Sequence, residues 1–232
     1  MKLGLLQCDH TLESVRHIAG DYDVMFARWL PAEWRVYDLT TGEAPRDLNE
    51  CDAYITTGSK ASVYDDEPWI HQFAALTQRI HAAGVPFLGV CFGHQMMGHA
   101  LGGRVAKSPN GWGIGVHTFT ISKHEAWMQP ATASINVLMS CQDQVLDLPP
   151  GAEVLGGNAH CPVGIFRMGR MLGIQGHPEF TPAYAEALLH LRRERIGAER
   201  VDKALVTLHT PLHPELLATW TTNFCNEPHA NL

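Results

Sequence analysis

The chain has 232 residues, of which 45% are hydrophobic and 18% are charged, an ordinary globular balance that argues against a disordered protein. Its 17 Lys and Arg against 24 Asp and Glu give a formal net charge of −7, so the chain has no electrostatic reason to bind nucleic acid or anionic lipid. We therefore expect a small neutral or zwitterionic substrate.

The first residues, Met1–Gln7, contain one Lys and a very short apolar run. A secretory signal needs an apolar stretch of roughly 7–15 residues and a small-residue cleavage site. No stretch of about 18 apolar residues is present to span a membrane, so we expect a cytoplasmic protein that does not associate with membranes. The six cysteines form no C-x-x-C pair and are expected to be free thiols.

Short apolar runs alternate with helical patterns in the first part of the chain. Strands are expected over residues 2–8, 34–39, 53–57 and 87–90, and helices over residues 22–30, 68–84 and 92–101. From residue 104 the pattern changes to strand, turn, strand, with strands expected over residues 115–122, 135–139, 153–155, 163–167 and 171–174. Helical patterns return over residues 182–196, 199–208 and 214–225.

This alternation predicts an α/β fold with a mostly parallel central sheet flanked by helices and a small antiparallel β insertion. There is no repeat or long linker, so residues 1–232 are expected to form a single domain. Within it, the catalytic core would cover about residues 1–195 and C-terminal helices about residues 196–232.

A G-x-C-x-G segment stands where a short buried strand runs into a helix: Gly89-Val90-Cys91-Phe92-Gly93. This is the nucleophile-elbow arrangement with Cys in place of Ser, and the glycines allow close approach of the backbone around a strained turn. At the helix N-terminus the dipole favours the thiolate of Cys91, and the backbone N–H of Phe92 is free to bind an oxyanion. The alternative is a buried structural Cys on a glycine-rich turn.

His177 stands out among 14 histidines because it follows a strand and is followed by Pro178 and Glu179. The carboxyl ends of parallel strands meet at one edge of a sheet, so Cys91 and His177 can face the same crevice. Pro178 restricts the backbone of His177 to extended conformations, which places the side chains of residues 177 and 179 on one side. Glu179 could then orient the imidazole in a Cys-His-Glu triad.

Two segments resemble the signature motifs of the class I, or triad-type, glutamine amidotransferases. Residues 89–95 look like the nucleophile motif, and residues 173–180 look like the His-Pro-Glu motif. In serine hydrolases with a similar elbow the acid precedes the histidine, whereas here His177 precedes Glu179. The resemblance covers about residues 50–190, implies a flavodoxin-like sheet, and is closest to the glutaminase domain of GMP synthase and to stand-alone γ-glutamyl peptidases.

The resemblance implies further roles around the triad. Gly58 and Phe92 would supply the two oxyanion N–H groups, although Gly58 by itself is an ordinary turn glycine. The residues expected to contact or border the substrate are Gln95, Ser140, Cys141 and Gln142. Polarity alone would also allow Gln95 on a helix surface.

The chain departs from its relatives in two respects. They usually have His where Cys141 stands, and Cys is a smaller and poorer hydrogen-bonding group, so substrate choice can differ. The chain also lacks an S-G-G-x-D-S pyrophosphatase loop and has no room for a synthase domain, so it is not expected to be a complete GMP synthase.

The expected activity is cysteine-dependent hydrolysis of glutamine or a γ-glutamyl amide through a γ-glutamyl thioester, which needs no metal and no cofactor. A zinc site is not favoured because no ligand spacing typical of zinc is present. Three alternatives stay open: a glutaminase that supplies ammonia to a separate synthase subunit, a self-contained γ-glutamyl peptidase, and a non-catalytic regulatory module. The sequence leaves the homo-oligomeric state open.

Overall fold

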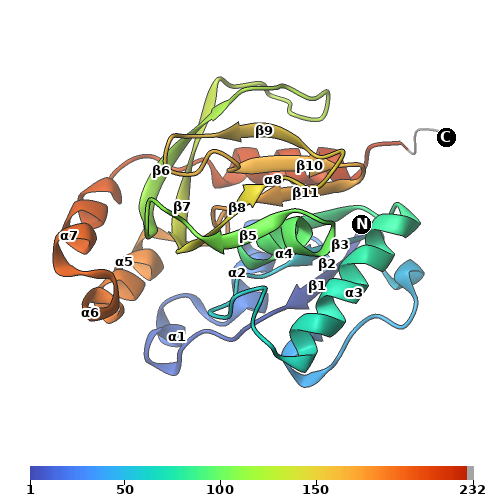
Figure 1. The fold of residues 1–232 in the computed structure, drawn as a ribbon, viewed down its shortest axis with the longest axis horizontal. Helices are drawn as coiled ribbons and strands as arrows, with labels where there is room; N and C mark the ends of the chain where they lie inside the picture. The colour runs from blue at the N-terminus through green and yellow to red at the C-terminus, as the bar shows by residue number, and fades with distance from the viewer. Residues whose placement is uncertain (229–232) are drawn as a thin grey trace.

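The computed structural model of the chain describes residues 1–228, and at its centre lies a nine-stranded sheet with helices on both faces (Figure 1). The strand order is β2, β1, β3, β4, β11, β10, β9, β6, β7. The first five of these run parallel: β2 (Glu33–Asp38), β1 (Lys2–Gln7), β3 (Ala53–Thr56), β4 (Phe87–Val90) and β11 (Met171–Ile174). Their carboxyl ends therefore meet at one edge of the sheet.

The other end of the sheet is antiparallel. It contains β10 (Ile165–Met168), β9 (Glu153–Gly157), β6 (Gly113–Ile121) and β7 (Ser134–Cys141). A separate two-stranded antiparallel sheet is formed by β5 (Arg104–Lys107) and β8 (Asp143–Asp147). The predicted α/β architecture is confirmed, and most of the antiparallel strands extend the main sheet.

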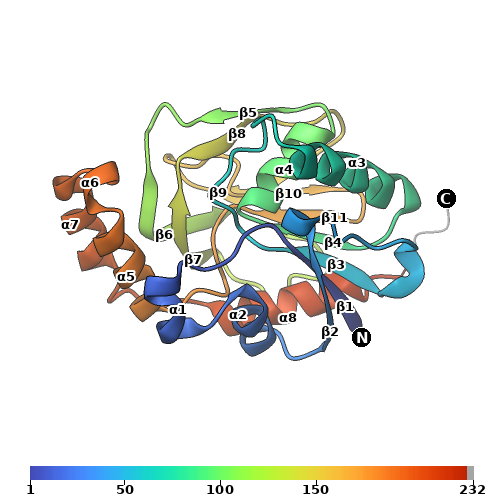
Figure 2. The same ribbon diagram turned by 90° about the horizontal axis from the view of Figure 1, so that it is seen from below.

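The helices cover the sheet in two layers (Figure 2). On one face lie α1 (Glu13–Ala19), α2 (Tyr22–Trp29) and α8 (Pro214–Cys225), and on the other lie α3 (Pro68–Ala83) and α4 (Phe92–Ala100). Near β6 and β7 lie α5 (Pro182–Leu191), α6 (Arg193–Ile196) and α7 (Ala198–Thr207). Two short 3₁₀ helices span Leu39–Thr41 and Leu48–Glu50.

The three parallel strands at the centre of the sheet, β3, β4 and β11, are buried on both sides, which explains their apolar sequences. All four residues of β3, of β4 and of β11 are buried. On the face covered by α8, Trp220 and Phe224 pack into the same core as Leu3 and Leu5 of β1. The C-terminal helix therefore belongs to the packing that holds the sheet.

The helix expected over residues 182–196 is interrupted. Thr181 caps α5 by accepting a hydrogen bond from the backbone N–H of Tyr184, and α5 ends at Leu191. Arg192 has φ −98° and ψ 8° and links α5 to the short α6. This break turns Arg192 and Arg195 toward the edge of the sheet that carries the candidate site, since both line the pocket described below. None of the helices within residues 1–228 is long and apolar enough to cross a membrane.

Candidate active site

Cys91 lies in a strained turn between β4 and α4. Its φ is 50°, and within residues 1–228 it is the only non-glycine residue with a positive φ. A Cβ on Gly93 would stand 1.7 Å from Thr56 Oγ1, and a Cβ on Gly89 would stand 2.5 Å from the carbonyl carbon of Gly93. These close approaches explain why only glycine fits on either side of the turn that carries Cys91.

His177 and Glu179 follow β11 and are paired in the core of the site. His177 Nδ1 lies 2.7 Å from Glu179 Oε1, and their side chains are only 3% and 0% exposed. The backbone N–H of His177 donates to the Leu138 carbonyl of β7 at 2.7 Å. The ring of Phe180 stacks on the imidazole with centroids 4.0 Å apart and an interplanar angle of 7°. The imidazole is therefore fixed by a carboxylate, an aromatic face and its own backbone, which leaves Nε2 for a reacting group.

The charge of Glu179 is the largest of the effects that favour the protonated imidazole. Burial by itself would lower the pKa of His177, but the Glu179 carboxylate and the neighbouring Cys91 raise it to about 10. The other carboxylate oxygen of Glu179, Oε2, is buried and has no hydrogen-bond partner among residues 1–228. The carboxylate therefore has the imidazole of His177 as its partner. An imidazolium beside a thiolate is the pairing that activates a cysteine nucleophile.

The loop after β3 brings Gly58 against both reacting groups. A Cβ on Gly58 would stand 2.8 Å from His177 Cε1 and 3.7 Å from Cys91 Cβ. The loop is held from the β1 side, because Thr57 Oγ1 accepts from the Cys8 N–H at 2.8 Å and the Asp9 carboxylate accepts from the Lys60 N–H at 2.9 Å. A side chain at position 58 would clash with the imidazole of His177. Glycine is therefore required here by the closeness of His177 rather than by the backbone conformation of a turn.

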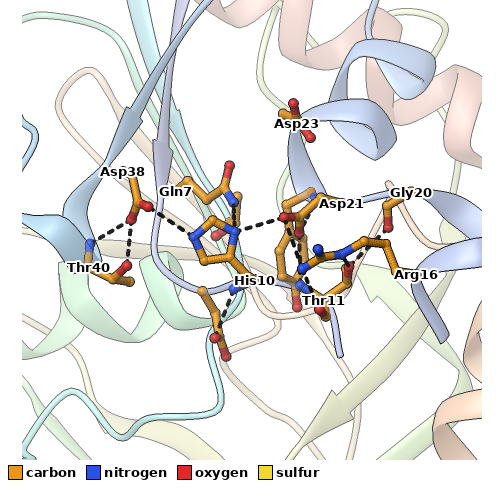
Figure 3. Close-up of polar contacts among 12 residues, drawn as sticks. Gln7, His10, Thr11, Arg16, Gly20, Asp21, Asp23, Asp38 and Thr40 are labelled. Atoms are coloured by element: carbon orange, nitrogen blue, oxygen red, sulfur yellow. Dashed lines mark hydrogen bonds and ion pairs between the residues drawn. The ribbon is translucent and has the colours of Figure 1, made fainter. Parts of the chain in front are cut away.

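The neighbouring segment between β1 and α1 is held in place by hydrogen bonds of His10 (Figure 3). Its Nδ1 lies 2.8 Å from Asp21 Oδ2 and its Nε2 lies 3.0 Å from Asp38 Oδ2. The hydrogen bond to Asp21 raises the pKa of His10, and Asp38 adds to this effect. His10 therefore ties the end of β1 to the start of α2 and the end of β2.

Phe92 is the first residue of α4, so its backbone N–H precedes the helical hydrogen bonds. The first of these runs from the Gln95 N–H to the Cys91 carbonyl at 3.0 Å. The Phe92 ring points into the core, where it packs on Trp69 and Phe73 with centroids 5.5 and 6.2 Å away. The backbone N–H of Phe92 can thus be anchored beside Cys91 without its side chain entering the site.

Gln95 is buried rather than on a helix surface, and it belongs to a chain of amides. Its Nε2 donates to the Asp143 carbonyl at 2.7 Å and to Gln175 Oε1 at 3.3 Å. The Gln175 Nε2 in turn lies 3.6 Å from Cys91 Sγ. Gln175 was not identified from the sequence as a site residue, although it stands two positions before His177. Its signal is a polar residue at the end of a strand that is otherwise wholly apolar.

Ser140, Cys141 and Gln142 line one pocket together with Cys91 and Gln95, so the structure brings together the residues expected to border the substrate. Burial raises the pKa of the Cys141 thiol, with Cys91 adding to the effect, and keeps it neutral. Ser140 Oγ accepts a hydrogen bond from Arg192 at 2.9 Å. We call this the Cys91 pocket.

The rim of the Cys91 pocket carries charged residues that the sequence did not single out. They are Lys60, Lys107, Arg192 and Arg195, which are basic, and Asp65 and Asp143, which are acidic. These residues come from distant parts of the chain, so no local pattern in the sequence marks them. Within residues 1–228, no group of three or more His, Cys, Asp or Glu side chains is arranged to hold a metal ion.

The chain is similar to known proteins over most of its length. It is 28% identical to γ-glutamyl peptidase 3 of Arabidopsis thaliana over 90% of this chain and 88% of that protein. It is 31% identical to a GMP synthase of Thermomicrobium roseum, over 65% of this chain but only 32% of the synthase. Its fold matches the crystal structure of a glutamine amidotransferase from Thermotoga maritima with a TM-score of 0.78 at 19% identity, covering 97% of this chain and 98% of that one.

The model of the family described as glutamine amidotransferase class-I matches residues 30–191. That range contains the elbow at Cys91, the His177–Glu179 pair and the loop of Gly58. The chain therefore belongs to the class I glutamine amidotransferase family.

Proposed function

We propose that this protein hydrolyses the amide bond of γ-glutamyl compounds through a γ-glutamyl thioester on Cys91. The observation that carries the proposal is the buried His177–Glu179 pair, 2.7 Å apart, beside a cysteine held at positive φ at a helix N-terminus. A structural cysteine needs neither the strained turn nor the charged imidazole.

In the first step the Cys91 thiolate attacks the γ-carbonyl carbon. The backbone N–H groups of Phe92 and Gly58 bind the oxyanion, a contribution on the order of 10²–10³ in rate for each donor. The C–N bond then breaks, and His177 gives its proton to the departing amine.

In the second step water attacks the thioester. His177, now neutral, takes a proton from that water, and the C–S bond breaks to release glutamate and the thiolate. Glu179 keeps the imidazole oriented and stabilises its charge in both steps.

The proposal is tested by measuring turnover of glutamine and of a series of γ-glutamyl dipeptides by the purified protein. We expect release of glutamate from at least one of these substrates, and no release by a folded Cys91→Ala variant. Full activity of Cys91→Ala would move the nucleophile to another residue.

A second candidate is a glutaminase that supplies ammonia to a synthase subunit. The relatives named GMP synthase favour it, because this chain aligns with about a third of their length. Glutamine turnover that appears only after a synthase partner is added would support this candidate against the self-contained hydrolase.

A further inference from the structure

A second pocket adjoins the Cys91 pocket. Lys60, Arg192 and Arg195 line both pockets and so form a shared cationic wall. They come from the loop after β3, the junction of α5 with α6, and α6 itself. Three positive side chains thus gather beside the nucleophile of a chain whose net charge is −7.

Two of the three cations are free to accept an anionic ligand. Lys60 is paired with Asp9 at 3.0 Å. Arg192 donates only to the neutral Ser140 hydroxyl, and the guanidinium of Arg195 lies 5.1 Å from the centroid of the Trp112 ring. Within residues 1–228, neither arginine forms an ion pair with a carboxylate. Guanidinium groups are well suited to bind carboxylates through paired hydrogen bonds.

Beyond this wall the second pocket has a group of apolar side chains next to the polar Asp9, His10 and Thr11. Its lining includes Leu12, Tyr22, Tyr184, Leu188 and Leu191. Leu12 and Leu191 are 42% and 49% exposed, so an apolar group bound there would cover surface that now faces solvent. The arrangement from the nucleophile outward is therefore a thiol, a cationic wall and an apolar surface.

We propose that the second pocket and its cationic wall form a subsite for the leaving group, which recognises an amino acid with a free carboxylate and an apolar side chain. The substrate class would be γ-glutamyl dipeptides with an apolar C-terminal residue. In such a dipeptide the nitrogen of the scissile bond and the terminal carboxylate share one carbon, so a carboxylate bound by Arg192 and Arg195 stays close to Cys91. Ammonia, the leaving group of glutamine, would engage neither the arginines nor the apolar surface.

This inference rests on the proposed function, and a binding experiment separates the two. The Cys91→Ala variant, which cannot form the thioester, is titrated calorimetrically with γ-glutamylphenylalanine, γ-glutamylphenylalaninamide and γ-glutamylalanine. We expect the free carboxylate to bind about tenfold to hundredfold more tightly than the amide, the range that one charge-assisted hydrogen bond gives. The smaller alanine side chain should also bind more weakly than phenylalanine.

Arg195→Gln, added to Cys91→Ala, should remove most of the preference for the carboxylate. Arg193→Gln is the matched control, because Arg193 lies on the same short helix but pairs with Asp202 and lines neither pocket. Equal binding of acid and amide, or a preference that persists in Arg195→Gln, would overturn the leaving-group subsite. Equal binding of the alanine and phenylalanine compounds would overturn its apolar part. Absence of turnover by the wild type, with the carboxylate preference intact, would instead refute the proposed hydrolysis.

Discussion

At the scale of single residues, the site depends on two charged groups kept away from water. Glu179 is fully buried and has His177 as its partner, and this pairing raises the pKa of the imidazole to about 10. His177 should therefore carry its proton at neutral pH and be ready to protonate a leaving amine. The alkaline limb of the activity profile is thus expected to reflect loss of the proton of His177.

Glu179→Gln keeps the shape of the side chain but removes its charge. The pKa of His177 should then fall from about 10, because burial lowers it and the carboxylate no longer opposes this. We expect kcat to fall about 10²–10⁴-fold and the alkaline limb of kcat/KM to move to lower pH. Glu186→Gln, on the exposed face of α5, is the control. An unchanged alkaline limb would show that Glu179 does not govern the imidazole.

Gln175 should assist the thiolate directly. Its amide nitrogen lies 3.6 Å from Cys91 Sγ and can donate a hydrogen bond to that sulfur. Gln175→Leu removes the donor at similar volume, so alkylation of Cys91 by iodoacetamide should slow by about tenfold at neutral pH. Gln78→Leu, at an exposed position on α3, should leave the rate unchanged. If both variants react like the wild type, the contact has no electrostatic role.

At the scale of elements, the site is made where separate loops meet at one edge of the sheet. The Gly58 loop is attached to the end of β1, the elbow is part of α4, and His177 is bound to β7. The positions of these backbones matter as much as the reactive side chains, because they set the oxyanion donors against the thiol.

Gly58→Ala tests this arrangement. The new Cβ would stand 2.8 Å from His177 Cε1, so the imidazole or the loop must shift. We expect at least a hundredfold loss in kcat/KM from the displaced oxyanion donor, while the thermal unfolding midpoint changes by no more than a few degrees. A fully active Gly58→Ala enzyme would place the second oxyanion donor elsewhere.

Elements with a strong local pattern were predictable from the sequence. The bounds of β4, β11 and α8 agree with those expected, because each is a clear apolar run or a periodic segment opened by Pro. In contrast, α1 was not foreseen, since it has seven residues and only Val15 and Ala19 are buried. The predicted small antiparallel insertion is present as the sheet of β5 and β8, but the positions of these two strands were not expected, because β5 has one buried residue and is stabilised by pairing with a distant strand.

The same difference, between residues in a local sequence pattern and residues that depend on distant contacts, applies to the site. Cys91, His177 and Glu179 lie in short motifs whose spacing predicts a triad, and the structure brings these three residues together. Arg192 and Arg195 depend on where a helix breaks, and Gln175 depends on which strand lies beside β4. The contacts of the two arginines are properties of tertiary packing and leave no local pattern, whereas Gln175 has one local signal, a polar residue at the end of an apolar strand.

At the scale of the whole molecule, His10 connects three segments of the fold through Asp21 and Asp38. The raised pKa of His10 means that its contribution to stability is complete below its unfolded value of about 6.5 and is lost as the pH rises through its folded value. The pKa values of Asp21 and Asp38 are lowered, despite an opposing effect of burial, so their contribution is lost only as the pH falls through their folded values. The network should be strongest in mildly acidic solution.

His10→Gln should accordingly lower the free energy of unfolding by about 0.5–1 kcal/mol near pH 5.5, a modest effect because the side chain is 44% exposed. The difference between variant and wild type should shrink at an alkaline pH above the folded pKa of His10, where the imidazolium has lost its proton. Urea unfolding at both pH values measures this. A difference that grows with pH would contradict the charge assignment.

The central claim is that Cys91 carries a γ-glutamyl thioester during turnover. The most direct measurement is the intact mass of the protein after rapid mixing with a γ-glutamyl dipeptide and acid quenching, followed by peptide mapping. The account predicts a transient increase equal to one glutamyl group, located on Cys91, sensitive to hydroxylamine and absent in Cys91→Ala. Turnover of the substrate with no adduct on Cys91 in the wild type, and equal turnover by Cys91→Ala, would contradict it.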